Sequence, residues 1–491
     1  MSRLNFRAIS LIIQYCIVVM VLLSPLGALP KYMLKEIPYF SISKILFLLV
    51  ILLHSLFVLS KRMKIDVGKL DLAILFFGLS LVVSIIRFPD VDLAYIVVAS
   101  VFGYLCLNMV IQSHMKEMYI SKALDYIVYS ALISSLIAFV QFLTGVRLLD
   151  VFDTSKLYYI GDSFIVLGTE ENANAFSAVF IMPFVVSSAR YFFEHRKTVK
   201  LFYLCSNIIF FLSLMLTICR ATVMSVFIAE LVVLACLYFI VKIKLSKIFI
   251  YGLIYILVII SWSIFMPTHS VEILFGKDPL ITKFESLNHR ILLKKYNFLE
   301  STRLYGPGEE KIRLLNYYHK KKLSLIAEGQ KPPEVMREQR YFLKEKSMSK
   351  DIRKNLTILN LKVFAENPLL GIGFNRFRIN SGKQLGFTNG DTLTPHSNIL
   401  GIASELGLSG LLPYLFILLY TVYVGFKAVL KKGSENKSEL ISLLAAYIGF
   451  IIFGLFHTSF VTVLSWIVMS FIVVFSKNIL SEKKYEDRFS P

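Results

Sequence analysis

The sequence predicts an all-α membrane protein that crosses the bilayer many times, and three observations lead to this fold class. Of the 491 residues, 56% are hydrophobic, and they are gathered into repeated apolar runs of membrane-spanning length. Short polar turns join most of these runs. Lys and Arg are distributed unevenly between alternate turns, which is typical of multi-pass proteins. We therefore expect about twelve transmembrane helices and one long extracytoplasmic loop that contains short helices.

A hydropathy window of about 19 residues separates the apolar runs and divides the chain into four parts. We expect an N-terminal bundle of about nine spans in 1–266, a large loop in 267–395, the C-terminal helices in 396–476 and a tail in 477–491. The predicted spans are 8–27, 41–60, 69–86, 93–112, 122–143, 173–190, 199–219, 221–241, 246–266, 407–428, 438–456 and 459–476.

The balance of positive charge predicts the orientation of these spans. If the N-terminus is cytoplasmic, the inner segments carry 23 Lys and Arg residues, whereas the short outer segments carry 6. Cytoplasmic loops are enriched in positive charge, so both termini are predicted to be inside and the large loop outside. Long loops cross a membrane largely regardless of their charge, so the basic residues of 267–395 do not oppose this orientation.

Composition also excludes several classes of function. The net charge of +20 is spread over loops between spans and accompanies no nucleic-acid-binding motif, so we expect no nucleic-acid partner. The basic N-terminus has no evident cleavage site after its apolar run, which predicts a retained first span. The cysteines form no CxxC pair, and each falls in or beside an apolar span, as small hydrophobic residues do. They are Cys16, Cys106, Cys205, Cys219 and Cys236.

The basic part of the large loop, 283–350, is open to two interpretations. Its Lys, Arg, Tyr and Glu residues are compatible with a solvated, partly helical subdomain over the outer face. They are also compatible with a basic platform for anionic lipid headgroups or a charged glycan.

Polar residues gather on the predicted outer side at two turns of the N-terminal bundle. Asn174 lies where the sixth span begins, and either it or Asn172 could cap that helix. Arg220 lies in the very short turn between the seventh and eighth spans. A snorkelling arginine is one explanation, but an ionisable residue at an apolar boundary favours an anionic binding partner.

A third outer stretch, 351–377, is predicted as a short amphipathic helix ended by a proline and followed by a tight glycine turn. Gly371 and Gly373 in this turn would allow backbone to approach a ligand closely. Arg353 in the helix and Arg376 after the turn supply positive charge on the same side of the membrane.

A fourth stretch, 394–412, places His396 immediately before a helix-start signature. The Ser-Asn pair that follows can cap free backbone N–H groups, and an apolar helix containing Glu405 comes next. His457, between the last two spans, is a second outer imidazole that the end of a helix would explain equally well.

These residue types suit group transfer from a lipid diphosphate. Arginine binds phosphate through paired, charge-assisted hydrogen bonds, and an imidazole accepts a proton from a hydroxyl near neutral pH. Asp90 and Asp92 form a DxD pair that could hold Mg²⁺, although helix starts are also rich in aspartate, and we predict no metal site. The sequence contains no GxxxxGK[ST] phosphate-binding loop, which argues against a reaction or transport driven by ATP hydrolysis.

Three motifs resemble the O-antigen ligase/polymerase superfamily of bacterial envelope enzymes. Residues 395–410, PHSNILGIASELGLSG, resemble its H-[NS]-x-x-L-x-x-x-x-E-x-G-x-x-G signature. Arg353 followed by NPLLGIGFNRF in 367–377 resembles its R…P-x-x-G-x-G-x-x-x-F segment. Cys219-Arg220-Ala221 resembles its SRG/SRA turn, with Cys in place of Ser. The resemblance extends over about residues 165–476.

The resemblance implies a C-type glycosyltransferase-like membrane fold without metal or other cofactor, and a substrate of undecaprenyl-diphosphate-linked oligosaccharide. His396 would be the base that activates the acceptor hydroxyl, and Arg220 and Arg353 would hold the diphosphate. We add Arg376, Asn174, Glu405 and His457 as candidate substrate-binding residues. The expected location is the bacterial inner membrane, where the protein contacts bilayer lipid. A chain-length regulator protein is a possible partner.

Within this family we expect a polymerase of repeat units for O-antigen or a similar surface polysaccharide, because the chain is long and its outer loop extended. The alternative is a ligase that transfers glycan to lipid A-core or to protein. A transporter of the lipid-linked glycan would show two similar halves and charged helices at the midplane. The sequence has no internal repeat, and its ionisable residues gather at one face, which favours an enzyme.

Overall fold

In the computed structural model, each predicted span coincides with a helix, except that the sixth coincides with two. Ten helices of the described residues are long and apolar enough to cross a membrane, and two shorter apolar helices accompany them. The protein is therefore an all-α polytopic membrane protein. The structure describes residues 3–26, 42–61, 67–89, 94–144, 159–160, 163–164, 166, 169, 173–217, 219–265, 339–378, 381, 394–431, 437–457 and 462–489.

Apolar runs of this length form helices because every backbone polar group must be satisfied within the segment. The N-terminal bundle contains α1 (Arg3–Leu23), a 3-10 turn η1 (Ser24–Leu26), α3 (Ile42–Lys61), α4 (Lys69–Arg87), α5 (Ala94–His114), α6 (Glu117–Thr144), α7 (Ala173–Ala178), α8 (Ile181–Phe193), α9 (Lys197–Leu216), α10 (Arg220–Phe239) and α11 (Leu245–Phe265). The C-terminal part contains α16 (Gln339–Glu366), α18 (Asn398–Leu430), α19 (Lys437–Gly454) and α20 (Val463–Phe489). Two-residue strands β1 (Tyr159–Ile160) and β2 (Ser163–Phe164) pair antiparallel and are a small departure from the all-helical prediction.

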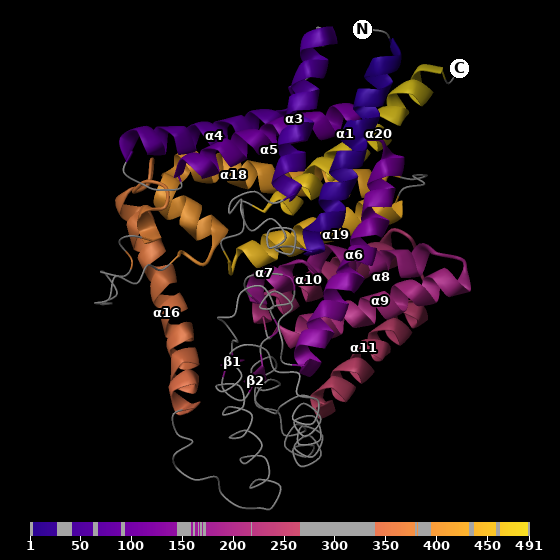
Figure 1. The fold of residues 1–491 in the computed structure, drawn as a ribbon, viewed down its shortest axis with the longest axis vertical. Coiled ribbons are helices and arrows are strands. Elements are labelled where there is room, and N and C mark those ends of the chain that lie inside the picture. Colours follow the sequence, from indigo (N-terminus) through magenta and orange to yellow (C-terminus); the bar gives the residue numbers. More distant parts are fainter. Residues whose placement is uncertain are drawn as a thin grey trace, which may run out of the picture.

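The C-terminal helices are packed into the N-terminal bundle and do not form a separate body. α18 lies along α4, and α19 lies between α8 and α10 (Figure 1). One continuous apolar core runs through these contacts, whereas residues such as Ile86 and Leu419 point outward and are 75% and 68% exposed. Outward-facing apolar side chains are expected on a protein whose surface meets lipid.

A partly buried ionic network links four helices of the bundle. The Arg190 guanidinium on α8 lies 2.9 Å from the Glu439 carboxylate on α19 and 3.3 Å from the Asp125 carboxylate on α6. Tyr203 on α9 donates a hydrogen bond of 3.1 Å to Asp125. Paired charges of this kind hold helices in register, because separating them would leave a charge buried without a partner.

Three elements differ from their predicted form. α16 has 28 residues, so the predicted short helix before the glycine turn is much longer. In Figure 1 it stands across the ends of α4 and α18 and is not aligned with them. The sixth span is divided into α7 and α8. The tenth begins at Asn398, because the capped segment before Gly407 is already helical.

The basic stretch 283–338 and Asp90 and Asp92 lie outside the described residues.

Candidate active site

Helix α18 is broken near its start, and the glycine turn after α16 fills the break. Gly407 has a φ of 62° inside the helix, and Gly371 in the turn also has a φ of 62°. The turn accepts hydrogen bonds from the backbone N–H groups of Leu408 and Ser409, and it donates to the carbonyls of α18 just before the break. The backbone groups that a broken helix leaves without partners are thereby satisfied.

The two backbones are in direct contact at this junction. A Cβ atom on Gly371 would lie 2.3 Å from the Glu405 carbonyl, and one on Gly407 would lie 2.5 Å from the Leu369 carbonyl carbon. We expected the glycines of the turn to admit a ligand. The structure instead shows that Gly371 admits the backbone of α18, so this close approach is structural.

The break folds the beginning of α18 back toward its own middle. Along an unbroken α-helix, residues 16 positions apart would be separated by about 24 Å. The Asn398 amide nevertheless donates a hydrogen bond of 3.3 Å to the Tyr414 hydroxyl. The residues just before Asn398, including His396, therefore lie away from the break and level with Tyr414 along the second part of α18.

The backbone around His396 is unusual. Ser397 is the N-cap of α18, as predicted, because its side chain accepts a hydrogen bond of 3.4 Å from the Leu400 N–H. His396 has a φ of 53°, in the left-handed region that residues other than glycine rarely adopt. Strained backbone of this kind occurs most often at functional sites, where the surrounding structure holds it in place.

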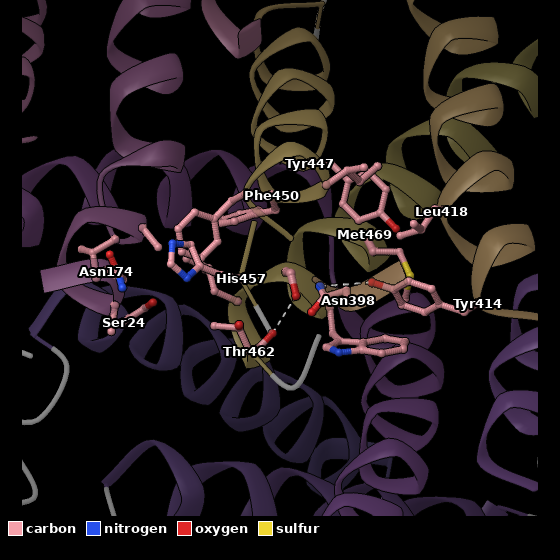
Figure 2. Close-up of a pocket in the computed structure, with 18 of the residues that line it drawn as sticks. Ser24, Asn174, Asn398, Tyr414, Leu418, Tyr447, Phe450, His457, Thr462 and Met469 are labelled. Atoms are coloured by element: carbon pink, nitrogen blue, oxygen red, sulfur yellow. Dashed lines mark hydrogen bonds between the residues drawn. The ribbon is translucent and has the colours of Figure 1, made fainter. Parts of the chain in front are cut away.

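A cavity of about 610 Å³ lies between α7, α18, α19 and α20 and contains three of the predicted site residues. His396, His457 and Asn174 all line it. Figure 2 shows Asn174 and His457 toward one end, and Asn398 and Tyr414 toward the other. A volume of this size is ordinary for a small-molecule site.

The two imidazoles face one another across the first part of this cavity. Their ring centroids are 6.5 Å apart and nearly perpendicular, and His457 also stacks on Phe453 at 4.7 Å. Burial lowers the pKa of His396 below 6.5, and the positive charge of Arg353 on α16 lowers it further. Burial lowers the pKa of His457 to about 4, with smaller contributions from Arg353 and His396. Both rings are therefore neutral near pH 7, and His396 is able to accept a proton.

Asn174 connects the cavity to the start of α10. The Cys219 thiol donates a hydrogen bond of 3.1 Å to the Asn174 side-chain oxygen. Arg220 follows Cys219 as the first residue of α10, and its side chain is exposed. Asn174 lies within α7 and is not its cap, because that helix begins at Ala173. Arg220 thus lies beside the cavity without lining it.

Two predicted binding residues lie elsewhere. The Arg376 guanidinium is 4.2 Å from the centre of the Phe88 ring, a cation–π contact that attaches the glycine turn to the end of α4. Glu405 is buried and accepts hydrogen bonds from the backbone N–H groups of Phe377 and Asn375. Neither lines the cavity. Their contacts in this structure hold the turn against α18.

The cavity also contains aromatic residues that sequence reasoning missed. They are Tyr414, Tyr447, Phe450, Phe453 and Trp466. In the sequence these residues look like ordinary core positions of apolar helices, and only the rarity of tryptophan, with two in the chain, singles out Trp466.

Within the described part of the chain, no three His, Cys, Asp or Glu residues are grouped as metal ligands would be. The described residues that line the cavity include two imidazoles and no carboxylate.

The family model described as "O-Antigen ligase" matches residues 205–415, from α9 to the middle of α18. A search of curated proteins gave no match. The matched residues include Arg220, Arg353 and His396, and they end just after Tyr414. Residues 205–415 are therefore similar to the O-antigen ligase family, in agreement with the motif resemblance to the O-antigen ligase/polymerase superfamily.

Proposed function

We propose that this protein polymerises undecaprenyl-diphosphate-linked oligosaccharide repeat units into O-antigen or a similar surface polysaccharide. The family match indicates a glycosyltransferase-like or ligase enzyme in general. The observation that supports glycosyl transfer at this site is the cavity, in which the strained and neutral His396 faces a second imidazole, while the positive charge of Arg353 acts on His396 from outside the lining.

The proposed reaction is an inverting glycosyl transfer without a metal. A hydroxyl oxygen of the acceptor sugar attacks the anomeric carbon of the donor, and His396 takes the hydroxyl proton. The bond between that carbon and the phosphate oxygen breaks, and its electron pair leaves with undecaprenyl diphosphate. Arg220 and Arg353 stabilise the negative charge that develops on this leaving group. Attack opposite the leaving group inverts the configuration of the anomeric carbon.

The position of Arg353 links substrate binding to the basicity of His396. In the free protein, the positive charge of Arg353 disfavours the protonated imidazole. A bound diphosphate would offset this charge and add negative charge nearby, which favours the protonated form. His396 therefore becomes a stronger base when the donor is present.

We place the reaction at the outer face of the bacterial inner membrane, with both termini cytoplasmic and the large loop extracytoplasmic. The charge balance of the short loops supports this orientation. Fusing green fluorescent protein to the C-terminus tests it, because that reporter fluoresces only when it folds in the cytoplasm. A dark C-terminal fusion on a full-length, membrane-inserted chain would contradict the orientation.

A ligase is the second candidate, and the description of the matched family favours it directly. Such an enzyme would use the same cavity and base, but would transfer finished glycan to lipid A-core or to protein. The length of the chain and of the loop between α11 and α18 leads us to prefer the polymerase.

Purified protein incubated with lipid-linked repeat units tests the chemistry. The wild type should lengthen the glycan and release undecaprenyl diphosphate, while His396→Ala and Arg220→Ala should lose at least about a hundredfold in rate, as expected for a base or a charge-stabilising group. His195→Ala, which removes an exposed imidazole between α8 and α9, is the matched control. Full activity in both site variants would refute the proposed catalytic roles.

A further inference from the structure

Helix α10 carries an ionisable residue in the middle of a membrane span, and the proposed reaction does not use it. Glu230 lies near the midpoint of this helix, which runs from Arg220 to Phe239. It does not line the cavity that contains His396. A carboxyl group at such a depth is rare, because an ionised side chain is costly in hydrocarbon, and it usually has a function.

The Glu230 carboxyl group begins a chain of polar contacts that crosses three neighbouring helices. The Ser188 hydroxyl on α8 is hydrogen-bonded to Glu230 Oε1. The Tyr251 hydroxyl on α11 lies 3.1 Å from Ser188 Oγ and 3.2 Å from the side-chain oxygen of Asn207 on α9. The orientation of the Asn207 amide is fixed, because its nitrogen donates a hydrogen bond of 2.6 Å to the Phe184 carbonyl. The chain therefore ends at an oxygen that can only accept.

The number of protons in this chain depends on the charge of Glu230. The chain contains three contacts between oxygen atoms, and each hydrogen bond needs one proton. The Ser188 and Tyr251 hydroxyls supply two protons, and the Asn207 oxygen supplies none. Tyr255 adds a contact of 3.2 Å to Tyr251 and brings its own proton, so the balance is unchanged. All these contacts are hydrogen bonds only if the Glu230 carboxyl group supplies the third proton.

An ionised Glu230 would also lack a compensating cation among the described residues. Its second oxygen, Oε2, is buried and has no hydrogen-bond partner in this part of the chain. The cation on the neighbouring helix α8, Arg190, is engaged by the carboxylates of the ionic network. Tyr251 and Tyr255 on α11 face Glu230 and are uncharged near pH 7, and α19 packs against α10 here through Gly449. A buried charge without a partner is costly, so these surroundings favour the neutral acid.

Tyr251 is the point at which α11 is attached to the bundle. Within residues 245–261 it is the only buried residue, at 1% exposed. Its ring stacks on that of Tyr191 on α8, with centroids 5.4 Å apart, and its hydroxyl belongs to the chain that begins at Glu230. Figure 1 shows α11 at the edge of the bundle beside α9. Contacts that hold Tyr251 therefore hold the helix that precedes the large loop.

We propose that Glu230 is a proton-binding site within the membrane. Its carboxyl group holds a proton at neutral pH and donates it to Ser188, which completes the chain that attaches α11 to α8 and α9. The ligand is a proton and not a metal cation, because the oxygens of the chain already lie at hydrogen-bonding distance from one another and leave no space between them. The site thereby stabilises the position of α11 without placing a charge in the bilayer.

Infrared spectroscopy of the full-length protein in detergent tests the charge state directly, because a neutral carboxylic acid and a carboxylate absorb at different frequencies. The spectrum of the wild type minus that of Glu230→Gln at pH 7 should contain the carbonyl band of a neutral carboxylic acid. Glu439→Gln is the matched control, because the Glu439 carboxylate lies 2.9 Å from the Arg190 guanidinium, and its difference spectrum should contain carboxylate bands. Carboxylate bands in the Glu230 difference spectrum would overturn the proposal.

The thermal unfolding midpoints of the same two variants test whether the neutral form is the one that the fold uses. Glutamine has the shape of a neutral glutamic acid and keeps a donor for Ser188, so Glu230→Gln should keep or raise the midpoint at pH 7. Glu439→Gln should lower it, because Arg190 loses a charged partner. A lowered midpoint in Glu230→Gln, or its failure to fold, would contradict a protonated Glu230.

A tyrosine pair tests the attachment of α11. Tyr251→Phe keeps the ring and removes the hydroxyl in the middle of the chain, so it should lower the unfolding midpoint. Tyr423→Phe, at a tyrosine on α18 that is 60% exposed, should leave the midpoint unchanged. Equal midpoints in the two variants would show that the chain does not hold α11.

Discussion

At the scale of single residues, the environment of His396 determines when it can act as a base. Its ring is half-buried, its backbone is in the left-handed region, and Arg353 repels a proton from it. Because burial and the charge of Arg353 both lower its pKa, the neutral form persists to more acidic pH than for an ordinary imidazole. The acid limb of kcat/KM, which reports the free enzyme, is therefore expected below pH 6.5.

Removing the charge of Arg353 tests this dependence. In Arg353→Gln the pKa of His396 should rise, although burial still holds it below its ordinary value, so the acid limb of kcat/KM should move to higher pH. The maximal rate should also fall, since a proposed diphosphate ligand is lost. Lys354→Gln, at the exposed neighbouring position, should leave the acid limb in place. An acid limb that stays fixed or moves to lower pH in Arg353→Gln would contradict the electrostatic account.

At the scale of elements, the interlocked break in α18 positions the site. The glycine turn after α16 satisfies the broken helix, and the break carries His396 and Asn398 down to the level of Tyr414. Glu405 and Arg376 hold the turn from either side through hydrogen bonds and a cation–π contact. The two motif segments that resemble the superfamily thus form one structural unit.

Side chains at the two glycines of the junction should disrupt this unit. Gly407→Ala and Gly371→Ala each place a Cβ within 2.5 Å of backbone and force a non-glycine residue to positive φ. The backbone strain alone is about 1–3 kcal/mol, and the overlap adds to it. Thermal unfolding of the purified variants measures the loss. Gly252→Ala is the control, because nothing lies within 4 Å of its added Cβ, and it should be neutral or slightly stabilising. Equal stability of all three variants would contradict the described junction.

At the scale of the whole molecule, partly buried polar contacts connect α19, one wall of the cavity, to the rest of the bundle. The network of Arg190, Asp125, Glu439 and Tyr203 joins α6, α8, α9 and α19. α19 supplies Tyr447, Phe450 and Phe453 to the cavity wall, so this network indirectly fixes one side of the site.

Arg190→Gln should therefore destabilise the entire bundle. It leaves two carboxylates near one another without their cation, and breaking a buried pair costs about 3–5 kcal/mol. The Arg190 and Asp125 side chains are 19% and 33% exposed, so we expect the lower end of this range. The measurement is the thermal unfolding midpoint in detergent. Arg196→Gln removes an arginine that is 75% exposed and paired with Glu194, and should not change the midpoint. A similar midpoint for both variants would show that the network contributes little.

The sequence predicted the helices well and the site only in part, for identifiable reasons. Long apolar runs can form only helices in a bilayer, and the Ser397 cap is a local signal, so both were predictable. Gly407 lies among apolar residues and looked like a helix position, so the fold-back of α18 was not expected. The contact of Arg376 with Phe88 joins segments far apart in the sequence. Trp466 resembles a core residue of an apolar helix, and only the packing of the helices shows that it lines the cavity.

The surface-glycan ladder of a deletion strain tests the central claim most directly. The strain is complemented with wild type, His396→Ala or His195→Ala, and its glycan is separated on a gel. We predict a full ladder with wild type and with His195→Ala, and a single attached repeat unit without a ladder for His396→Ala. Loss of all attached glycan, with long lipid-linked chains accumulating, would assign the ligase reaction instead. An unchanged ladder with His396→Ala would contradict the proposed role of this histidine.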